Sequence, residues 1–133
     1  MNIKTQFEPL PPIREIISTH NLKTRKTLGQ HFLLDLNLTD RIARSAGNIS
    51  DGTVFEIGPG PGSLTRSLLK AGARRVIAIE RDPRCITALT SLVDAAAGRL
   101  EVLEGDAQYI DLTKLAPPPR RIVANLPYNI STV

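Results

Sequence analysis

Cysteine and tryptophan are scarce in this 133-residue chain, which has Cys85 as its one cysteine and no tryptophan. A disulfide framework within the chain is therefore excluded. The sequence also lacks any run of about 18 apolar residues, the length needed to span a membrane. Residues 1–10 lack the apolar segment of a secretory signal peptide. We therefore expect a cytoplasmic protein without a membrane partner.

Neither sign of charge dominates, since 17 Lys and Arg residues face 13 Asp and Glu residues, a net charge of +4. Residues 1–30 nevertheless hold more basic than acidic side chains: Lys4, Arg14, Lys23, Arg25 and Lys26 against Glu8 and Glu15. A basic arm beside a ligand site suggests a polyanionic partner, nucleic acid first. Ordinary solvating charge is the alternative that composition leaves open.

Short apolar segments alternate with helical patterns through most of the sequence. We predict strands at 53–57, 75–80, 100–103 and 121–125. Helices are predicted at 13–17, from Asp35 to Gly47, at 63–71 and from Pro83 onward. The second carries Leu38, Ile42 and Ala46 at helical spacing, and the last carries Ile86, Leu89 and Val93. Apolar strands between helices are typical of a parallel sheet covered on both faces. The fold class is therefore α/β, and the domain is Rossmann-like.

The chain divides into a polar, proline-bearing tail with a short helix, residues 1–22, and a ligand-binding domain, residues 23–133. It stops directly after the fourth predicted strand, where a doubly wound sheet normally continues with a covering helix. We therefore expect a fragment whose domain is incomplete at its C-terminus.

A glycine-rich turn, Gly58-x-Gly60-x-Gly62, joins the first predicted strand to the helix that opens at Ser63. Glycines permit positive φ and let a ligand approach the backbone, and the helix directs its free N–H groups toward the same place. The dinucleotide fingerprint requires glycine at the position that Ser63 holds. The turn therefore suits a nucleotide-like ligand without a pyrophosphate.

Acidic residues stand where the strands end. Glu80 closes the second predicted strand and can accept hydrogen bonds from both ribose hydroxyls, while Asp106 follows the third and can accept one from an adenine amino group. Glu56, inside the first strand, needs a partner, and a cationic ligand is one candidate. The alternative is that Glu80 and Asp106 cap the following helices. Together with the glycines, they indicate an adenosine ligand, of which S-adenosylmethionine is the commonest without a diphosphate.

The tetrapeptide Asn125-Leu126-Pro127-Tyr128 ends the fourth predicted strand, on the same edge of the sheet. The side-chain oxygen of Asn125 and the carbonyl of Leu126 can hold the hydrogens of an exocyclic amine and so turn its lone pair toward a methyl donor. Pro127 fixes the backbone, and Tyr128 offers a ring on which a base can stack. A simple strand-terminating turn is the alternative.

These segments together resemble the small-subunit ribosomal RNA adenine dimethyltransferases (the KsgA type), relatives of the macrolide-resistance rRNA methyltransferases and of a mitochondrial transcription factor. The matching segments are 28–33 (LGQHFL), 56–65 (EIGPGPGSLT), 79–82 (IERD), 105–107 (GDA) and 125–131 (NLPYNIS). The resemblance implies the class I S-adenosylmethionine-dependent methyltransferase fold and S-adenosylmethionine as the cofactor.

The resemblance also implies residue roles. The glycine turn would approach the methionine part of the cofactor, Glu80 the ribose and Asp106 the adenine, while Asn125 would touch both cofactor and target amine. The implied cofactor-binding set is Gln30, His31, Leu33, Glu56, Gly58, Gly60, Glu80, Asp106, Ala107 and Asn125, the catalytic set is Asn125, Leu126, Pro127 and Tyr128, and Lys23, Arg25 and Lys26 are candidate RNA phosphate contacts.

His31 departs from the family pattern, which has Asn at this position. A protonated imidazole would repel the sulfonium, so we predict that cofactor affinity weakens as the pH falls through about 6.5, the ordinary pKa of histidine.

The implied substrate is two adjacent adenines near the 3′ end of 16S rRNA in the small ribosomal subunit, each dimethylated at N6 after leaving its stack. We expect a monomer without a metal. The family continues with more sheet and a small helical domain, so we expect absent or feeble methyl transfer from these 133 residues alone. The rival hypotheses are a non-catalytic RNA-binding ribosome-assembly or transcription factor, a methyltransferase acting on another planar amine, and a nicotinamide oxidoreductase.

Overall fold

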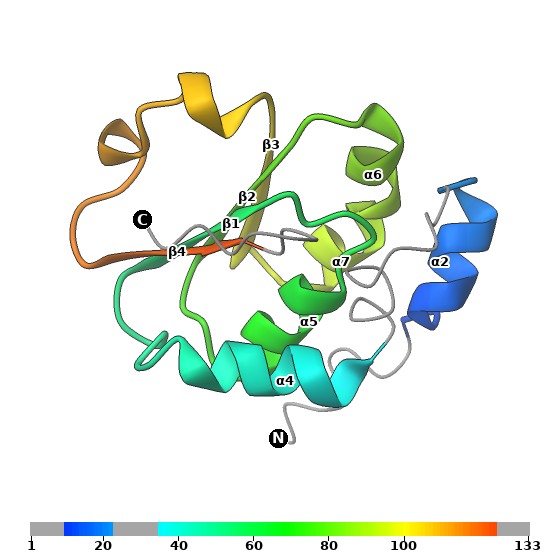
Figure 1. Ribbon diagram of the computed structural model, residues 1–133, viewed down its shortest axis with the longest axis horizontal. Helices are drawn as coiled ribbons and strands as arrows, with labels where there is room; N and C mark the ends of the chain where they lie inside the picture. The colour runs from blue at the N-terminus through cyan, green and yellow to red at the C-terminus, as the bar shows by residue number, and fades with distance from the viewer. Residues whose placement is uncertain (1–9, 23–34, 125–133) are drawn as a thin grey trace.

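The computed structural model describes residues 10–22 and 35–124 (Figure 1). Its centre is a four-stranded sheet in the order β3-β2-β1-β4, with every pairing parallel. The strands are β1 (Thr53–Ile57), β2 (Val76–Glu80), β3 (Leu100–Glu104) and β4 (Arg120–Ala124). The prediction of a parallel sheet is confirmed, and each described strand begins or ends within one residue of its predicted bounds.

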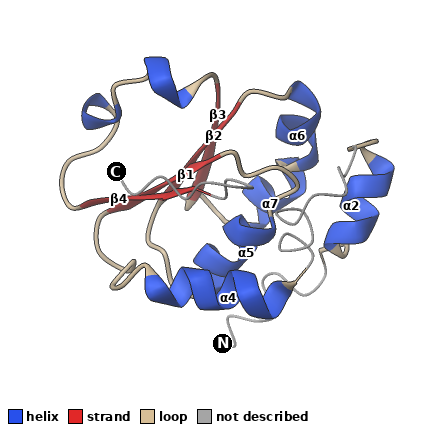
Figure 2. Ribbon diagram, in the orientation of Figure 1, coloured by secondary structure: helices blue, strands red, loops and turns tan. Residues whose placement is uncertain are grey.

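Helices lie on one side of this sheet (Figure 2). They are α4 (Leu36–Ser45), α5 (Ser63–Lys70), α6 (Pro83–Ala88) and α7 (Thr90–Ala95). The opposite side is covered, within the described ranges, by two short 3₁₀ helices, η1 (Ala107–Tyr109) and η2 (Leu112–Lys114). The predicted cover on both faces is confirmed for β1 and β2, although by different kinds of element, whereas Ile122 of β4, the partner of Phe55, is 56% exposed. The N-terminal helix α2 (Ile13–Thr19) confirms the helix expected there, and it lies at the end of the molecule beside α6 (Figure 1).

Alternation along the strands divides the core into two layers. One cluster joins the helix side, from β1, β2 and β3 to the helices, through Val54, Val76, Ala78, Leu100, Leu64, Leu68, Leu89 and their neighbours. The other joins the opposite side to the 3₁₀ helices through Phe55, Ile77, Ile79 and Ala116. Because successive strand residues point to opposite faces, burial on both sides accounts for the nearly continuous apolar sequence of the central strands β1 and β2, whereas the outer strands β3 and β4 are only partly buried.

A single helix was predicted from Pro83, but the structure has two, α6 and α7, so the prediction of one continuous helix was wrong. The break falls at Leu89, whose N–H is shared between the carbonyls of Cys85 (3.0 Å) and Ile86 (3.2 Å). Leu89 is fully buried, and its side chain packs where a Cβ on Gly62 would stand, 2.8 Å away. Apolar spacing continues across the break and therefore could not reveal it.

The helix predicted from Asp35 is confirmed as α4, with the Asp35 side chain accepting from the N–H groups of Asn37 (3.0 Å) and Leu38 (3.2 Å). Its most buried residues are Thr39 and Ala43, whereas the predicted apolar line of Leu38, Ile42 and Ala46 is only half-buried. The reason is a polar contact with α5, described next.

Helices α4 and α5 meet through buried hydroxyls. The hydroxyl of Ser67 lies 2.8 Å from that of Thr39 and 2.6 Å from the carboxylate of Asp40. Lys70 reaches the other oxygen of Asp40 at 3.5 Å. Thr39 therefore faces α5, where its hydroxyl meets that of Ser67. None of the described helices is long and apolar enough to cross a membrane.

Candidate functional site

The glycine turn after β1 has the backbone that only glycine adopts freely. Gly58, Gly60 and Gly62 have φ angles of 68°, 55° and 98°, all in the left-handed region. A Cβ added at Gly58 or Gly60 would meet nothing within 4 Å, whereas one at Gly62 would collide with Leu89. The first two glycines therefore border open space, and the third permits close packing of α5 against the α6–α7 junction.

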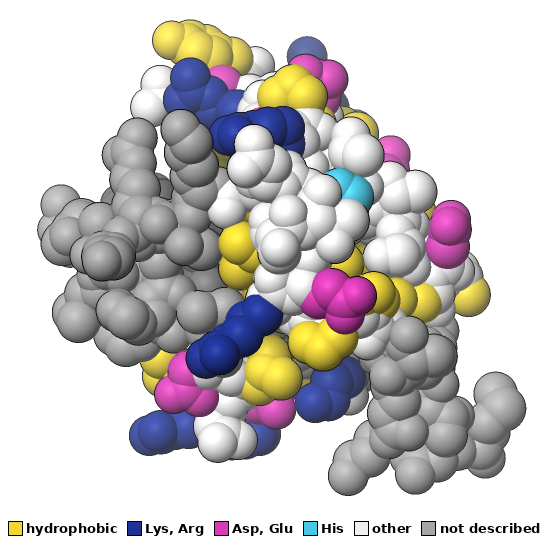
Figure 3. Space-filling view, turned by 90° about the vertical axis from the view of Figure 1, so that its right-hand side faces the viewer, with side chains coloured by type: hydrophobic (Ala, Val, Ile, Leu, Met, Phe, Trp, Pro, Cys, Tyr) yellow, Lys and Arg dark blue, Asp and Glu magenta, His cyan; other side chains and the backbone are white. Residues whose placement is uncertain are grey.

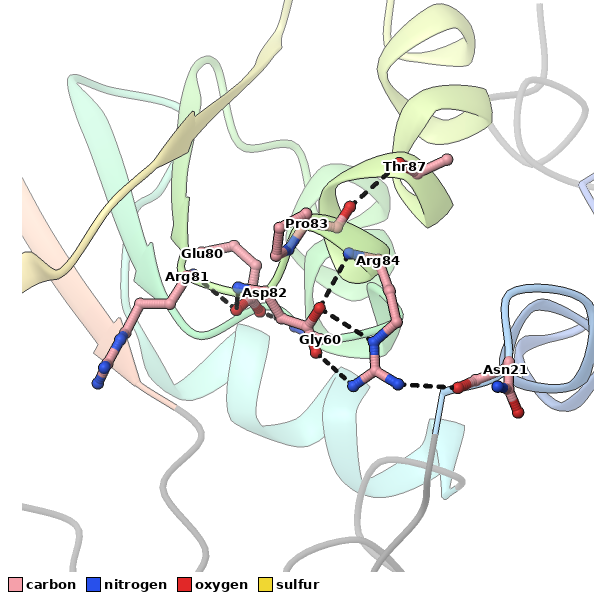
Figure 4. Close-up of polar contacts among 8 residues, drawn as sticks. All are labelled: Asn21, Gly60, Glu80, Arg81, Asp82, Pro83, Arg84 and Thr87. Carbon is pink, nitrogen blue, oxygen red and sulfur yellow. Dashed lines mark hydrogen bonds and ion pairs between the residues drawn. The ribbon is translucent and has the colours of Figure 1, made fainter.

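Glu80, the last residue of β2, holds this turn in place (Figure 4). One carboxylate oxygen accepts from the N–H of Gly60 at 3.0 Å, and the other accepts from the N–H groups of Arg81 (2.8 Å) and Asp82 (3.0 Å). The tips of β1 and β2 are thereby joined through a nearly buried carboxylate. The alternative that Glu80 caps the next helix is wrong, because that cap is Asp82.

Asp82 caps α6 by accepting from the N–H of Arg84 at 2.9 Å, and the guanidinium of Arg84 returns to the same carboxylate at 2.8 Å and 3.2 Å. These bonds from Arg84 lower the pKa of Asp82. The remaining Arg84 nitrogen donates to the carbonyl of Asn21 at 3.2 Å (Figure 4). The segment that follows α2 is therefore tied to the tip of β2.

Glu56 is fully buried in β1 on the side of α5. One of its oxygens accepts from the hydroxyl of Thr65, and the other has no hydrogen-bond partner among the described residues. Burial raises its pKa to about 7, against the lowering effect of Thr65, and the nearby charge of Glu80 adds to the rise. The prediction that Glu56 needs a partner is confirmed for one oxygen, whose hydrogen-bond partner is Thr65. The other oxygen has no partner among the described residues.

A second buried polar group without a hydrogen-bond partner among the described residues lies at the start of α5. The hydroxyl of Ser63 is fully buried and has no hydrogen-bond partner among the described residues. Buried polar atoms normally find partners, so Ser63 and Glu56 leave two unsatisfied groups beside the glycine turn.

Asp106 follows β3 on the same edge of the sheet. The N–H of Gly105 donates to the carbonyl of Glu80 at 2.9 Å, and Arg81 spans to the Asp106 carboxylate at 3.7 Å. Asp106 also caps η1 by accepting from the N–H of Gln108 at 2.9 Å, as the capping alternative expected. Ala107 begins η1 and packs against the second core cluster.

The predicted edge is thus formed by the ends of β1, β2 and β3, which bring Glu56 and Glu80 to the glycine turn and Asp106 to Arg81, directly after Glu80. Ala124, the last residue of β4, pairs with Ile57, directly before Gly58. The remaining predicted site residues lie outside the described ranges: Lys23, Arg25, Lys26, Gln30, His31, Leu33, Asn125, Leu126, Pro127 and Tyr128.

Thr65 and Arg84 are the contacts at this site that the sequence did not indicate. Asp82-Pro83 could have shown a helix cap, because proline favours the first helical position, but nothing local links Arg84 to Asn21. Cys85 adds no nucleophile, since burial first, and then the charges of Glu80 and Asp82, raise its pKa to about 12. Within residues 10–22 and 35–124, no group of three His, Cys, Asp or Glu side chains could hold a metal ion.

Comparison with known proteins identifies relatives over almost the whole chain. The family model for ribosomal RNA adenine dimethylase matches residues 21–133. The ribosomal RNA small subunit methyltransferase A of Rhodospirillum rubrum is 60% identical over 129 residues, which are 97% of this chain and 45% of that protein. The protein of the same name from Paramagnetospirillum magneticum is 63% identical, over 92% of this chain and 44% of its own length. The chain thus spans about 45% of the length of these relatives.

Two solved structures are similar to about three quarters of this chain. The 23S rRNA methyltransferase ErmE is 35% identical with a TM-score of 0.59, over 72% of this chain and 37% of that one. A dimethyladenosine transferase from Plasmodium falciparum is also 35% identical, with a TM-score of 0.56, over 73% of this chain and 34% of that one. The predicted class I methyltransferase fold is confirmed.

Proposed function

The chain belongs to the ribosomal RNA adenine dimethylase family, and we propose that it carries the S-adenosylmethionine-binding part of an rRNA adenine dimethyltransferase. The substrate is N6 of two adjacent adenines near the 3′ end of 16S rRNA, and the modification accompanies maturation of the small ribosomal subunit. The observation that supports this most directly is the Glu80 carboxylate bonded to Gly60 beside an open glycine turn. Relatives named as methyltransferases favour an enzyme over a non-catalytic RNA-binding factor.

The residues present fit this cofactor. Gly58 and Gly60 leave space at the turn, and the Glu80 oxygen that accepts from Gly60 has a lone pair left for a ribose hydroxyl. The free oxygen of Glu56 and the free hydroxyl of Ser63 can receive polar groups of the methionine part. Because a buried serine occupies the third fingerprint position, a dinucleotide fits less well.

Asp106 and Ala107 would hold the adenine ring. One carboxylate oxygen of Asp106 accepts from the N–H of Gln108, and the other forms an ion pair with Arg81 at 3.7 Å. The longer of these contacts leaves the second oxygen able to accept from the adenine amino group. Gln30, His31 and Leu33 complete the proposed cofactor site, and Lys23, Arg25 and Lys26 are proposed RNA phosphate contacts.

When bound, S-adenosylmethionine supplies an electrophilic methyl group. The chain's own contribution is to position the amine: Asn125 and Leu126 follow β4 in the sequence and, we propose, accept its two hydrogens. Pro127 restricts the backbone, and the Tyr128 ring stacks on the target base. Once methylated, the nitrogen loses its proton readily, so positioning and electrostatics suffice without a strong base. The arrangement is proposed for residues 23–133 of a cytoplasmic monomer, with 1–22 as a polar tail and short helix.

Calorimetric titration with S-adenosylmethionine, S-adenosylhomocysteine and NAD tests the cofactor assignment. Glu80→Ala is expected to weaken S-adenosylmethionine binding at least tenfold, since it removes a charged hydrogen-bond acceptor. The matched control is Glu104→Ala, because Glu104 is the partner of Glu80 on β3 but is exposed. Binding of NAD in preference to S-adenosylmethionine, or equal effects of the two variants, would refute the assignment.

Transfer of radiolabel from S-adenosylmethionine tests the substrate. The purified full-length protein is offered small ribosomal subunits, naked 16S rRNA and DNA, and the labelled base is identified by nucleoside chromatography. We expect label in N6,N6-dimethyladenosine from the small subunit. Label in DNA or in another base contradicts the proposed substrate while leaving the cofactor assignment intact.

A further inference from the structure

Arginines gather at the amino ends of the strands, on the edge of the sheet opposite to the proposed cofactor site. Arg44, Arg74 and Arg121 contact the loop at 47–52 that joins α4 to β1, and Arg41 stands about one turn before Arg44 on α4. We name these four the amino-edge arginines. They come from α4, from the turn after α5, and from β4. In Figure 1 these segments meet at the end of the molecule away from α2 and α6.

Contacts with the loop at 47–52 bring these segments together. The N–H of Gly47 donates to the carbonyl of Arg44 at 3.4 Å, and the N–H of Arg74 donates to the carbonyl of Ile49 at 3.1 Å. The guanidinium of Arg121 lies 3.6 Å from the position that a Cβ on Gly47 would take. Arg41 stands three residues before Arg44, on the same exposed side of α4.

The amino-edge arginines have no acidic partner among the described residues. Other basic side chains are already paired, namely Lys70 with Asp40, Arg75 with Glu101, Arg81 with Asp106 and Arg84 with Asp82. Arg41, Arg44 and Arg74 are exposed and Arg121 is half-buried. Within the loop at 47–52, Asp51 is the single acidic residue.

Interior packing accounts for other arginines near this edge but not for these. Arg99 donates to the carbonyls of Leu69 (2.7 Å) and Ala73 (2.7 and 3.0 Å), and Arg120 donates to the carbonyl of Ala116 (2.6 Å). The amino-edge arginines show no such bonds in the part of the chain that the structure describes. Their charges are therefore directed to solvent or to a partner.

The cofactor edge has the opposite character. Glu80, Asp82, Glu104 and Asp106 stand at its strand tips, and the basic residues there, Arg81 and Arg84, are already paired. The side of the molecule that carries α2 and α6 mixes basic, acidic and hydrophobic side chains (Figure 3). An RNA backbone would therefore be repelled by the described cofactor edge and attracted to the amino edge.

We propose that the amino-edge arginines bind the phosphate backbone of the RNA substrate, at a point remote from the target adenine. Guanidinium groups suit phosphates because they donate two parallel hydrogen bonds. Five-residue strands separate the two edges by roughly 17 Å at about 3.3 Å per residue, a distance that a folded RNA spans easily. The inference rests on the proposed function, since it takes RNA to be the substrate.

Salt-dependent RNA binding tests this surface. The probe is a fluorescein-labelled RNA from the 3′ end of 16S rRNA, titrated with the purified protein between 50 and 200 mM KCl. The test variant is Arg44→Gln/Arg74→Gln. The charge-matched control is Lys114→Glu, which also changes the net charge by two but lies on η2, on the other side of the sheet. Cofactor affinity and melting temperature are measured for each protein.

The double variant is expected to bind RNA at least tenfold more weakly at 100 mM salt and to lower the slope of log affinity against log salt by about 1.4 to 1.8, the value for two lost phosphate contacts. Its cofactor affinity and melting temperature are expected to match those of the wild type. Equal losses in the test and control variants, or no loss in the test variant, overturn the inference. Failure of the full-length wild-type protein to bind or methylate RNA would instead overturn the proposed function.

Discussion

Glu56 provides the sharpest test of the site, because its carboxyl is fully buried and only half satisfied. Its pKa rises from 4.5 to about 7 on folding. Between these values the unfolded chain ionises while the folded protein keeps the proton, so stability falls as the pH rises and the loss is complete above about 7. At about 1.4 kcal/mol per pKa unit, the loss is about 3 kcal/mol.

The perturbation is Glu56→Gln, whose amide oxygen can still accept from the Thr65 hydroxyl but cannot ionise. Urea unfolding at pH 5 and pH 8 should show the wild type losing about 2.5 kcal/mol relative to the variant, because part of the loss has already occurred at pH 5. This corresponds to a midpoint shift of roughly 1 to 2.5 M. Glu104→Gln reports the effect of removing an exposed acidic charge. If the difference between wild type and Glu56→Gln is the same at both pH values, the burial argument is refuted.

Thr65 sharpens this prediction, since its hydrogen bond lowers the pKa of Glu56. Thr65→Val should therefore raise that pKa further and extend the loss of stability to higher pH. The same titration affects the cofactor if its methionine ammonium meets the free oxygen of Glu56. Cofactor affinity should then increase as the pH rises through about 7, and this increase should vanish in Glu56→Gln.

Three further outcomes are expected. His31→Asn should remove the weakening of cofactor binding as the pH falls through about 6.5, measured by calorimetry in the Glu56→Gln background; an unchanged profile refutes the role of His31. Gly62→Ala should destabilise by about 1–3 kcal/mol in urea unfolding, because it combines positive φ with a clash against Leu89. Gly60→Ala, which has the positive φ without the clash, should destabilise by less and should also weaken cofactor binding. Arg99→Ala should destabilise by about 1–3 kcal/mol through the loss of its carbonyl contacts, with Arg99→Lys partly restoring the melting temperature.

Strands were the best-predicted part of the fold, because burial on both faces leaves a continuous apolar run with turn residues at each end. The sequence therefore located β1 without error and predicted that Glu80 and Asp106 would share one edge. Parallel pairing alone brings such strand tips together, whatever the details of packing.

Contacts between elements could not be read in the same way. Thr65 faces Glu56 only because α5 packs at one particular rotation on β1, and Arg84 reaches Asn21 across 63 positions of sequence. The break at Leu89 coincides with the packing of its side chain against Gly62. Each of these contacts depends on which side of a helix faces its neighbour. Apolar periodicity predicts that side only to within about one residue: in α4 the buried residues are Thr39 and Ala43, one position after the predicted Leu38 and Ile42.

The separation of charge between the two edges follows from the backbone itself. At the carboxyl edge, turns and helix starts expose N–H groups, and carboxylates accept hydrogen bonds from them. Glu80 accepts from three backbone N–H groups, and Asp82 caps α6 by accepting from one. At the amino edge, helix ends and loops expose carbonyls, and guanidinium groups satisfy those, as Arg99 does for the end of α5. A parallel sheet therefore favours acids on its ligand edge and bases behind it. The amino-edge arginines exceed what these carbonyls require, and this excess is the reason to assign them to a polyanion.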